Sequence, residues 1–282
     1  MHLLLVVVSL LLCWVLYRLA RQHDRTNAPH MAPSVSVPLL RTACEKVIRI
    51  APTSTAPLRV DAPVTPTLPS DLKQKVDELR SLICEGKAGW DSGAQLQADA
   101  HLDDLTLVRF IQAAPSAGTS AIVMFMSAMT WRAERGVGSL FAEFHPAALR
   151  EAVISHRQEA VLAHFYAGVG GIARDGTPFF VERLGRADFE EYAREAHTLQ
   201  LMQQAYVAQL EMIYRTVRTV SAAAGRLLHG VVIVDLSGLS LWALRKGMPV
   251  VRYAASTGLA YFPEGTMSVM VVNAPSVVAL MW

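Results

Sequence analysis

Two short apolar segments on either side of a helical pattern constrain the fold of this chain most strongly. Residues 231–236 and 268–272 are continuous runs rich in β-branched side chains, typical of strands buried on both faces. Between them apolar residues recur at helical spacing, and Pro249 stands just before this stripe, where a helix tolerates proline. The stripe consists of Val251, Ala254, Ala255, Gly258, Leu259 and Phe262. Strand, helix and strand in this order predict an α/β fold with two parallel strands joined by a right-handed crossover.

The composition leans apolar. Of the 282 residues, 52% are hydrophobic and 18% are charged, and the formal net charge is +2. No dense basic run follows the N-terminal segment, so we expect no nucleic-acid partner. Cys13, Cys44 and Cys84 are far apart and odd in number, which predicts neither a disulfide framework nor a metal site.

The N-terminus reads as a membrane segment followed by a linker. Residues 1–20 are predominantly apolar, and Arg18, Arg21 and Arg25 lie at or beyond the end of the apolar run. This placement of positive charge predicts a transmembrane signal anchor with the following domain in the cytosol, on an endomembrane such as the ER or Golgi. A cleaved signal peptide on a secreted protein is the alternative. Residues 21–69 are rich in proline and are predicted to form an extended linker.

Residues 70–140 are predicted to form a small helical region, and residues 141–282 an α/β domain. Ser70 is a good N-cap for a first helix, whose apolar stripe is Leu72, Val76, Leu79 and Ile83. In the second part, Asp175 and Gly176 predict a turn, with Pro178 near the start of the strand that follows. A long helix is predicted over residues 197–224 from its helical spacing of apolar residues.

No motif for catalysis, metal binding or phosphate binding stands out. The glycine-rich residues 168–171 precede a turn and a strand, whereas a dinucleotide loop follows a strand and opens a helix. His156 and His164 lack the partners that a zinc site requires. Asp235 ends a predicted strand without a visible partner base or nucleophile, which favours a turn role. We therefore expect no enzyme activity, no cofactor and no metal.

Six sequence blocks resemble the CRAL-TRIO family of lipid-binding domains. Three stand in the second half: VDLSGLS at residues 234–240, YFPEGTM at 261–267 and NAP at 273–275. Upstream, the family's helical signatures match at residues 103–113 and 131–137, and its D-G-x-P block matches at 175–185. The resemblance, which is to the branch of the yeast phosphatidylinositol-transfer protein, implies a helical region over 70–140 and a lipid-binding α/β domain over 141–282.

The resemblance implies that the sheet forms the floor of an apolar pocket. This pocket would hold one lipid, which is a phospholipid, a sterol or an isoprenoid. The function implied is lipid binding, with transfer between membranes or presentation, by a protein tethered to a membrane. An interaction or membrane-recruitment module that transfers no lipid is the alternative. The candidate pocket residues are Phe180, Tyr206, Val232, Val234, Val251, Ala255, Tyr261 and Val271.

The polar headgroup contacts of the phosphatidylinositol-binding branch are only partly matched. Glu264 corresponds to the glutamate that holds the inositol headgroup, and it is the headgroup candidate here. Residues 114–115, Ala-Pro, replace the branch's basic pair, and Gly230 and Val232 replace its hydroxyl side chains. The resemblance therefore implies weak binding of phosphoinositides and a more apolar ligand.

The family continues beyond the NAP block, whereas this chain stops at Trp282. We therefore expect a C-terminally incomplete domain with an incomplete sheet. Residues 268–272 and 277–282 are expected to leave apolar surface open, so that the fragment is marginally stable.

Overall fold

A computed structural model describes residues 64–86, 89–145, 155–164, 167–194, 196–263 and 265–275. The predicted membrane segment at residues 1–20 and all but the end of the predicted linker lie outside these residues. Within them, no helix is both long enough and apolar enough to cross a bilayer.

The predicted helical region is present. It consists of α3 (Ser70–Gly86), α4 (Ser92–Asp99), α5 (Asp104–Ala113), the 3-10 helix η2 (Ala114–Ala117), α6 (Ala121–Glu134) and α7 (Val137–Phe144). The stripe predicted for α3 is confirmed, because Val76, Leu79 and Ile83 are buried. Asp91 and Asp103 cap α4 and α5 by accepting hydrogen bonds from backbone N–H groups of the first turn.

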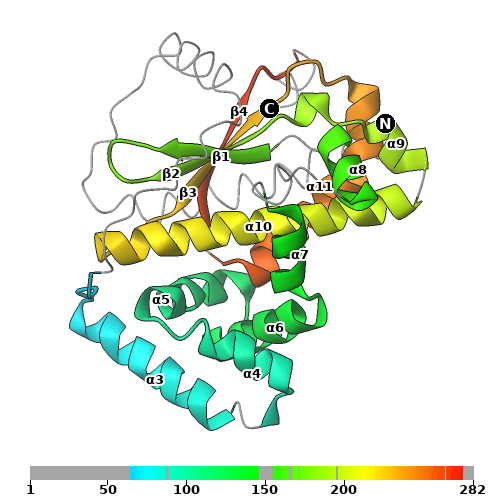
Figure 1. The fold of residues 1–282 in the computed structure, drawn as a ribbon. Coiled ribbons are helices and arrows are strands. Elements are labelled where there is room, and N and C mark those ends of the chain that lie inside the picture. The colour runs from blue at the N-terminus through cyan, green and yellow to red at the C-terminus, as the bar shows by residue number, and fades with distance from the viewer. Residues whose placement is uncertain are drawn as a thin grey trace.

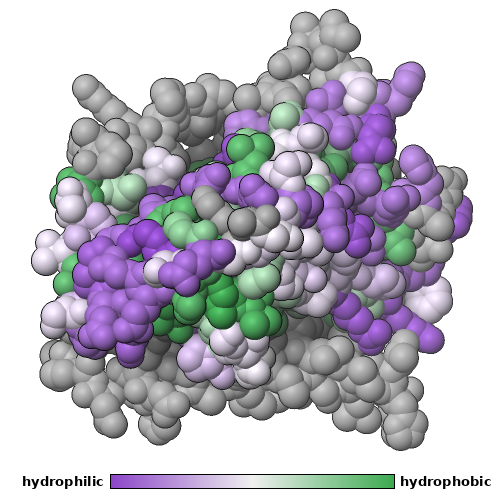
Figure 2. All heavy atoms as spheres, turned by 90° about the horizontal axis from the view of Figure 1, so that it is seen from below, coloured by the Kyte–Doolittle hydropathy of each residue, from purple (hydrophilic) through white to green (hydrophobic). Residues whose placement is uncertain are grey.

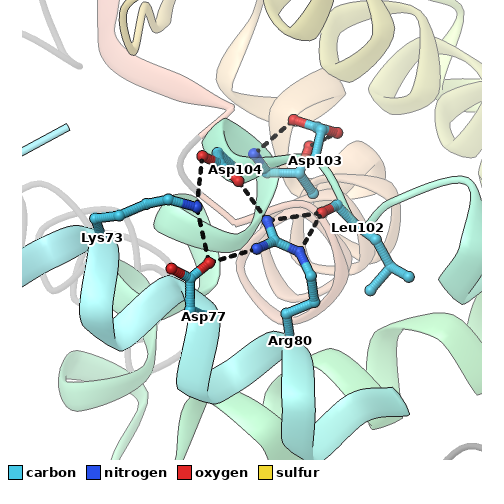
Figure 3. Close-up of polar contacts among 7 residues, drawn as sticks. Lys73, Asp77, Arg80, Leu102, Asp103 and Asp104 are labelled. Carbon is cyan, nitrogen blue, oxygen red and sulfur yellow. Dashed lines mark hydrogen bonds and ion pairs between the residues drawn. The ribbon is translucent and has the colours of Figure 1, made fainter. Parts of the chain in front are cut away.

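Polar contacts fix α3 against the start of α5 (Figure 3). Arg80 pairs with Asp104 and donates to the backbone oxygen of Leu102, with Nη2 at 3.2 Å. Lys73 Nζ lies 2.8 Å from Asp77 Oδ1 and 3.4 Å from Asp104 Oδ2. Because these groups are partly exposed, they orient the two helices more than they stabilise them.

The face of the molecule seen from below carries hydrophilic residues beside a smaller hydrophobic group (Figure 2).

The α/β part follows in the order expected. Its elements are α8 (His156–His164), β1 (Ala167–Ile172), β2 (Pro178–Glu182), the 3-10 helix η4 (Leu184–Arg186), α9 (Phe189–Arg194), α10 (Ala196–Ala224), β3 (Gly230–Asp235), α11 (Leu241–Tyr261) and β4 (Thr266–Val272). The strands lie in the order β1-β2-β3-β4. β1 and β2 are antiparallel, and β2, β3 and β4 are parallel, so the predicted parallel pair and the long helix are confirmed.

Strand β1 was not predicted, because it is built around glycines that have low strand propensity. The structure gives a reason for them. The ring of Phe179 on β2 lies over β1, and a Cβ at Gly170 would be 2.3 Å from Phe179 Cε2. The glycines therefore make room for an aromatic ring on the neighbouring strand.

The prediction for α11 was wrong in its start and only partly right in its buried face, since of the predicted stripe only Phe262, at the C-cap, is buried. The helix begins at Leu241, where the Ser240 side chain accepts a hydrogen bond from the Ala243 N–H, and Pro249 lies inside it. The predicted stripe residues Ala255 and Leu259 are exposed. The buried side chains are instead Met248, Val250 and Thr257. The cause is tertiary, because α11 packs against α6, α9 and α10 together.

Helix α10 lies between the sheet and the helical region, with the described helices below the sheet or beside one end of it (Figure 1). Two right-handed crossovers in the same direction along the sheet place α10 and α11 on the same face. On the other face of β3, Val231 and Ile233 are partly buried.

We predict that Gly185→Ala destabilises the protein by about 1–3 kcal/mol, the usual effect of overpacking. A Cβ at Gly185 would be 2.0 Å from the backbone oxygen of Ser237, which a side-chain movement cannot relieve. The control is Gly138→Ala in α7, where nothing lies within 4 Å of the added Cβ. This change should be neutral or stabilise by up to about 1 kcal/mol. Urea unfolding of both variants tests the prediction, and equal stabilities would contradict it.

Candidate functional site

The strand register brings four of the predicted pocket residues onto one face of the sheet. Phe180, Val232 and Val269 lie side by side in a first row. Glu182, Val234 and Val271 form a second row, one step nearer the carboxyl ends of the parallel strands. Both rows are on the face that α10 covers, because Phe180 and Val232 pack with α10. The α10 residues of this cluster are Met212, Ile213 and Val217.

The two rows differ in how closely α10 covers them. In the first row Phe180 is fully buried and Val232 is 6% exposed, whereas Val269 on β4 is partly buried. In the second row Val234 is partly buried and Val271 is 38% exposed. The apolar face thus opens toward the carboxyl ends of the strands and toward β4. An apolar ligand can reach the second row without displacing the core.

A polar cluster interrupts the second row. The carboxyl oxygen Oε1 of Glu182 accepts a hydrogen bond from Gln209 Nε2 at 2.6 Å and a long one from the Tyr206 hydroxyl at 3.5 Å. Burial raises the pKa of Glu182 to about 7, although these hydrogen bonds act in the opposite direction. Burial and the adjacent Glu182 carboxyl raise the pKa of Tyr206 well above its usual value. At about pH 7 roughly half of the Glu182 carboxyls are therefore protonated, and a protonated carboxyl can donate as well as accept a hydrogen bond.

Glu182 was missed by sequence reasoning, although one signal pointed to it. It lies two residues after Phe180 on the same strand, so the two side chains must share a face. The predicted pocket residue Tyr206 lies beside the second row, where its hydroxyl contacts Glu182.

The remaining predicted pocket residues lie on α11 and belong to neither row. Tyr261 stacks on Trp131 of α6, with ring centroids 4.2 Å apart and planes 6° apart. Val251 is partly buried and Ala255 is exposed. The headgroup candidate Glu264 lies outside the described residues, so its role stays a prediction.

Two positions where the phosphatidylinositol-binding branch has polar groups are closed by packing here. A Cβ at Gly230 would be 2.8 Å from Cε2 of the Phe180 ring, so a hydroxyl side chain has no room. Ala114, at the place of the branch's basic pair, is 2% exposed. Neither position supplies the polar contact that the branch uses there.

Asp235 has the turn role that the sequence favoured. Its Oδ1 accepts hydrogen bonds from the Ser237 N–H at 2.9 Å and from Asn273 Nδ2 at 2.9 Å. Partial burial acts to raise its pKa, but the hydrogen bonds from Asn273 and Ser237 hold the pKa of Asp235 below its usual value. The aspartate of VDLSGLS and the asparagine of NAP thus tie the ends of β3 and β4 together.

Two buried arginines, Arg109 and Arg132, join the helical region to α10. Arg132 Nη2 lies 2.5 Å from Glu211 Oε2, and both side chains are 2% exposed. Although burial acts to raise it, Arg132 and Arg215 hold the pKa of Glu211 below its usual value. Arg109 is fully buried and donates to Ser221 Oγ at 3.0 Å.

Among the described residues, no group of three or more histidine, cysteine or acidic side chains is arranged to hold a metal ion. The chemistry available at the two rows is therefore burial of an apolar group beside one hydrogen-bonding cluster.

Parallel strands with their crossover helices on one face, and an apolar face that opens beside those helices, define an α/β protein suited to enclosing an apolar ligand. Comparison with known proteins identifies it further. Residues 162–282 match the CRAL/TRIO domain, and this part of the chain belongs to that family.

Relatives match over a longer stretch. The chain is 28% identical over 211 residues to the SEC14 cytosolic factor of Eremothecium gossypii, which covers 74% of this chain and 62% of that protein. It is 30% identical over 176 residues to the Sec14 cytosolic factor of Schizosaccharomyces pombe, covering 62% of this chain and 58% of that one. The matched stretches thus span about three-fifths of these relatives.

Two further similarities are more distant. A phosphatidylinositol/phosphatidylcholine transfer protein of Arabidopsis thaliana, SFH9, is 26% identical over 186 residues, or 64% of this chain and 30% of that protein. The crystal structure of Sfh5 aligns at 14% identity with a TM-score of 0.48, covering 76% of this chain and 75% of that chain. The structural likeness is too weak to support a shared fold by itself.

We predict that Glu182→Gln stabilises the protein at about pH 8 but not at about pH 4. Folding raises the pKa of Glu182 from 4.5 to about 7, so ionisation is disfavoured in the folded state. At pH values below 4.5 the Glu182 carboxyl is protonated in both the folded and the unfolded protein, so its ionisation does not affect stability. As pH rises from 4.5 to about 7, the carboxyl ionises in the unfolded protein first and the destabilisation grows, and it is complete at pH values above about 7. Its upper limit is about 3 kcal/mol, and partial exposure reduces it.

Denaturant unfolding at several pH values tests this prediction. The control is Glu134→Gln, an exposed glutamate on α6. If the stability difference between wild type and Glu182→Gln does not change with pH, Glu182 is not the buried titrating group that the structure indicates.

Proposed function

We propose that this protein binds one apolar lipid between the second row of the sheet and helix α10, and carries it between membranes. The observation that carries the proposal is the row itself, an apolar strand face that opens beside α10 in a CRAL/TRIO domain. The printed name of the Arabidopsis relative, a phosphatidylinositol/phosphatidylcholine transfer protein, supports lipid exchange as the activity.

The energetics of exchange require no covalent chemistry. Burying an acyl or ring carbon contributes about 0.8 kcal/mol per CH₂ whether the surroundings are a bilayer or a protein. The two environments are therefore nearly balanced, and a lipid passes between them without an energy source. We propose no enzymatic step.

The preferred ligand is a lipid without a phosphate at the second row. Neither row contains lysine or arginine, and Glu182 places a carboxyl where a phosphate would be repelled. The Glu182–Gln209 pair instead suits a hydroxyl or carbonyl oxygen, as carried by a sterol or an isoprenoid. A phospholipid fits only if its headgroup lies outside the second row. Glu264, the predicted headgroup contact, would bind it there.

The tether is a separate proposal that rests on sequence alone. Residues 1–20 would anchor the protein in an endomembrane with the lipid-binding domain in the cytosol, because the arginines at 18, 21 and 25 follow the apolar run. Sequencing of the mature N-terminus should find residue 1 or 2 first. A mature protein that begins after residue 20 would contradict the tether and leave the lipid site untouched.

We predict that the purified full chain carries one lipid, and that Val271→Trp removes it. Val271 is in the second row and partly exposed, so a tryptophan there fills the space that the ligand needs. Met270→Trp is the matched control, since Met270, the residue before Val271 on β4, points to the opposite face. Native mass spectrometry should show a lipid adduct on wild type and on Met270→Trp only.

A wild-type chain without any adduct would favour the alternative, an interaction or recruitment module that transfers no lipid. Equal loss in both variants would place the ligand elsewhere. Phosphatidylinositol offered in excess should displace the adduct less readily than a sterol does, and the reverse order would contradict the assignment of the ligand class.

A further inference from the structure

The outer face of α11 combines an exposed aromatic ring, exposed arginines and an exposed leucine. Trp242 is 56% exposed and Leu259 is 42% exposed. Arg245 and Arg252, which lie between them in the sequence, are also exposed. The four are spaced i, i+3, i+10 and i+17, which places them within about 100° of one another around the helix. We call this set the α11 outer stripe.

All the charged residues of α11 are basic. Its 21 residues include Arg245, Lys246 and Arg252 but no aspartate or glutamate. Lys246 lies 4.8 Å over the Trp242 ring and 3.5 Å from Glu190 of α9, so Glu190 offsets one of the three charges. In the described part of the chain no ion-pair partner stands against Arg245 or Arg252. Two cations therefore face outward without compensation.

The inner side of α11 fixes the orientation of the stripe. A Cβ at Gly247 would be 2.2 Å from the Phe189 ring, so α9 lies directly against the helix. Val250, Ala243 and Leu244 pack in the same cluster as Val234 of the second row. The helix that presents the stripe thus also contacts the sheet beside the proposed lipid site.

We propose that the α11 outer stripe docks the protein on an anionic phospholipid membrane. This inference rests on the proposed function, since it names the surface at which the lipid would be exchanged. Tryptophan prefers the membrane–water interface, and nearby cations are attracted to anionic headgroups. The leucine adds apolar area that can enter the headgroup region.

The shape of the stripe favours a membrane over an acidic protein partner. It runs about 26 Å along the outer side of one helix, at 1.5 Å per residue. A helical peptide partner would need a hydrophobic groove, and acidic motifs are bound by clusters of arginines rather than by two cations spread along one helix. A flat anionic surface needs only a line of cations and an aromatic anchor on one convex element, which is what α11 presents.

The test uses quenching of Trp242 by brominated phospholipid in vesicles of phosphatidylcholine with or without phosphatidylserine. The proposed tether would hold the chain on any vesicle, so quenching reports specifically whether α11 reaches the bilayer. The fluorescence that Trp242 contributes is the difference between wild type and Trp242→Phe. We expect this fluorescence to be quenched when phosphatidylserine is present, and to recover when salt screens the charges.

The decisive variant is Arg245→Glu/Arg252→Glu. At the phosphatidylserine content that gives half-maximal quenching in wild type, the quenching of Trp242 in this variant should fall about fivefold or more, because its docking equilibrium weakens about tenfold or more. Lys75→Glu/Arg135→Glu makes the same change in net charge at exposed residues of the helical region, and it should behave as wild type. Equal effects of the two double variants, or quenching independent of phosphatidylserine, would overturn the proposal. So would quenching that an acidic peptide prevents but salt does not.

Failure of this inference is distinguishable from failure of the proposed function. Arg245→Glu/Arg252→Glu should keep its lipid adduct in native mass spectrometry, because its residues are outside the two rows. If wild type carries no lipid and Trp242 is still quenched, the docking surface stands and the lipid-transfer proposal falls.

Discussion

The buried ion pair between Arg132 and Glu211 is the interaction on which the arrangement of the two regions depends. It joins α6 of the helical region to the middle of α10, where both charges are removed from water. Removing one partner of such a pair leaves an uncompensated buried charge and costs about 3–5 kcal/mol. Around it, the burial of His101 and the charges of Arg132 and Arg218 lower the pKa of His101 to about 3, which keeps its ring neutral. The Arg132–Glu211 pair thus fixes how the helical region packs on α10.

With its outer side held by the helical region, α10 acts as the fixed wall of the proposed site. Its inner side buries the first row of the sheet and reaches the second row through Gln209 and Tyr206. A lipid-binding protein needs such a wall, because a loosely held helix would collapse into the space that a ligand vacates. Helix α11 extends the same layer, so the proposed lipid site and the proposed membrane surface lie on opposite sides of one helix.

The sequence predicted what local periodicity determines, and it missed what distant contacts determine. The stripe of α3, the long helix α10 and the strands β3 and β4 are regular over many residues, so their patterns were sufficient. Strand β1 depends on Phe179 covering Gly170, and the buried face of α11 depends on three other helices. Glu182 was missed because a carboxylate in a strand ordinarily faces water. Val251 and Ala255 were chosen from a stripe of which the tertiary packing fully buries only Phe262.

The central claim is that the lipid lies against the second row, on the α10 side of the sheet. Photo-cross-linking with a sterol that carries a diazirine, followed by peptide mapping of the full chain, tests it most directly. The account predicts adducts on Val234 or Val271 and on the facing part of α10 near Tyr206. Adducts confined to the opposite face, at Phe179, Val181 or Met270, would contradict it.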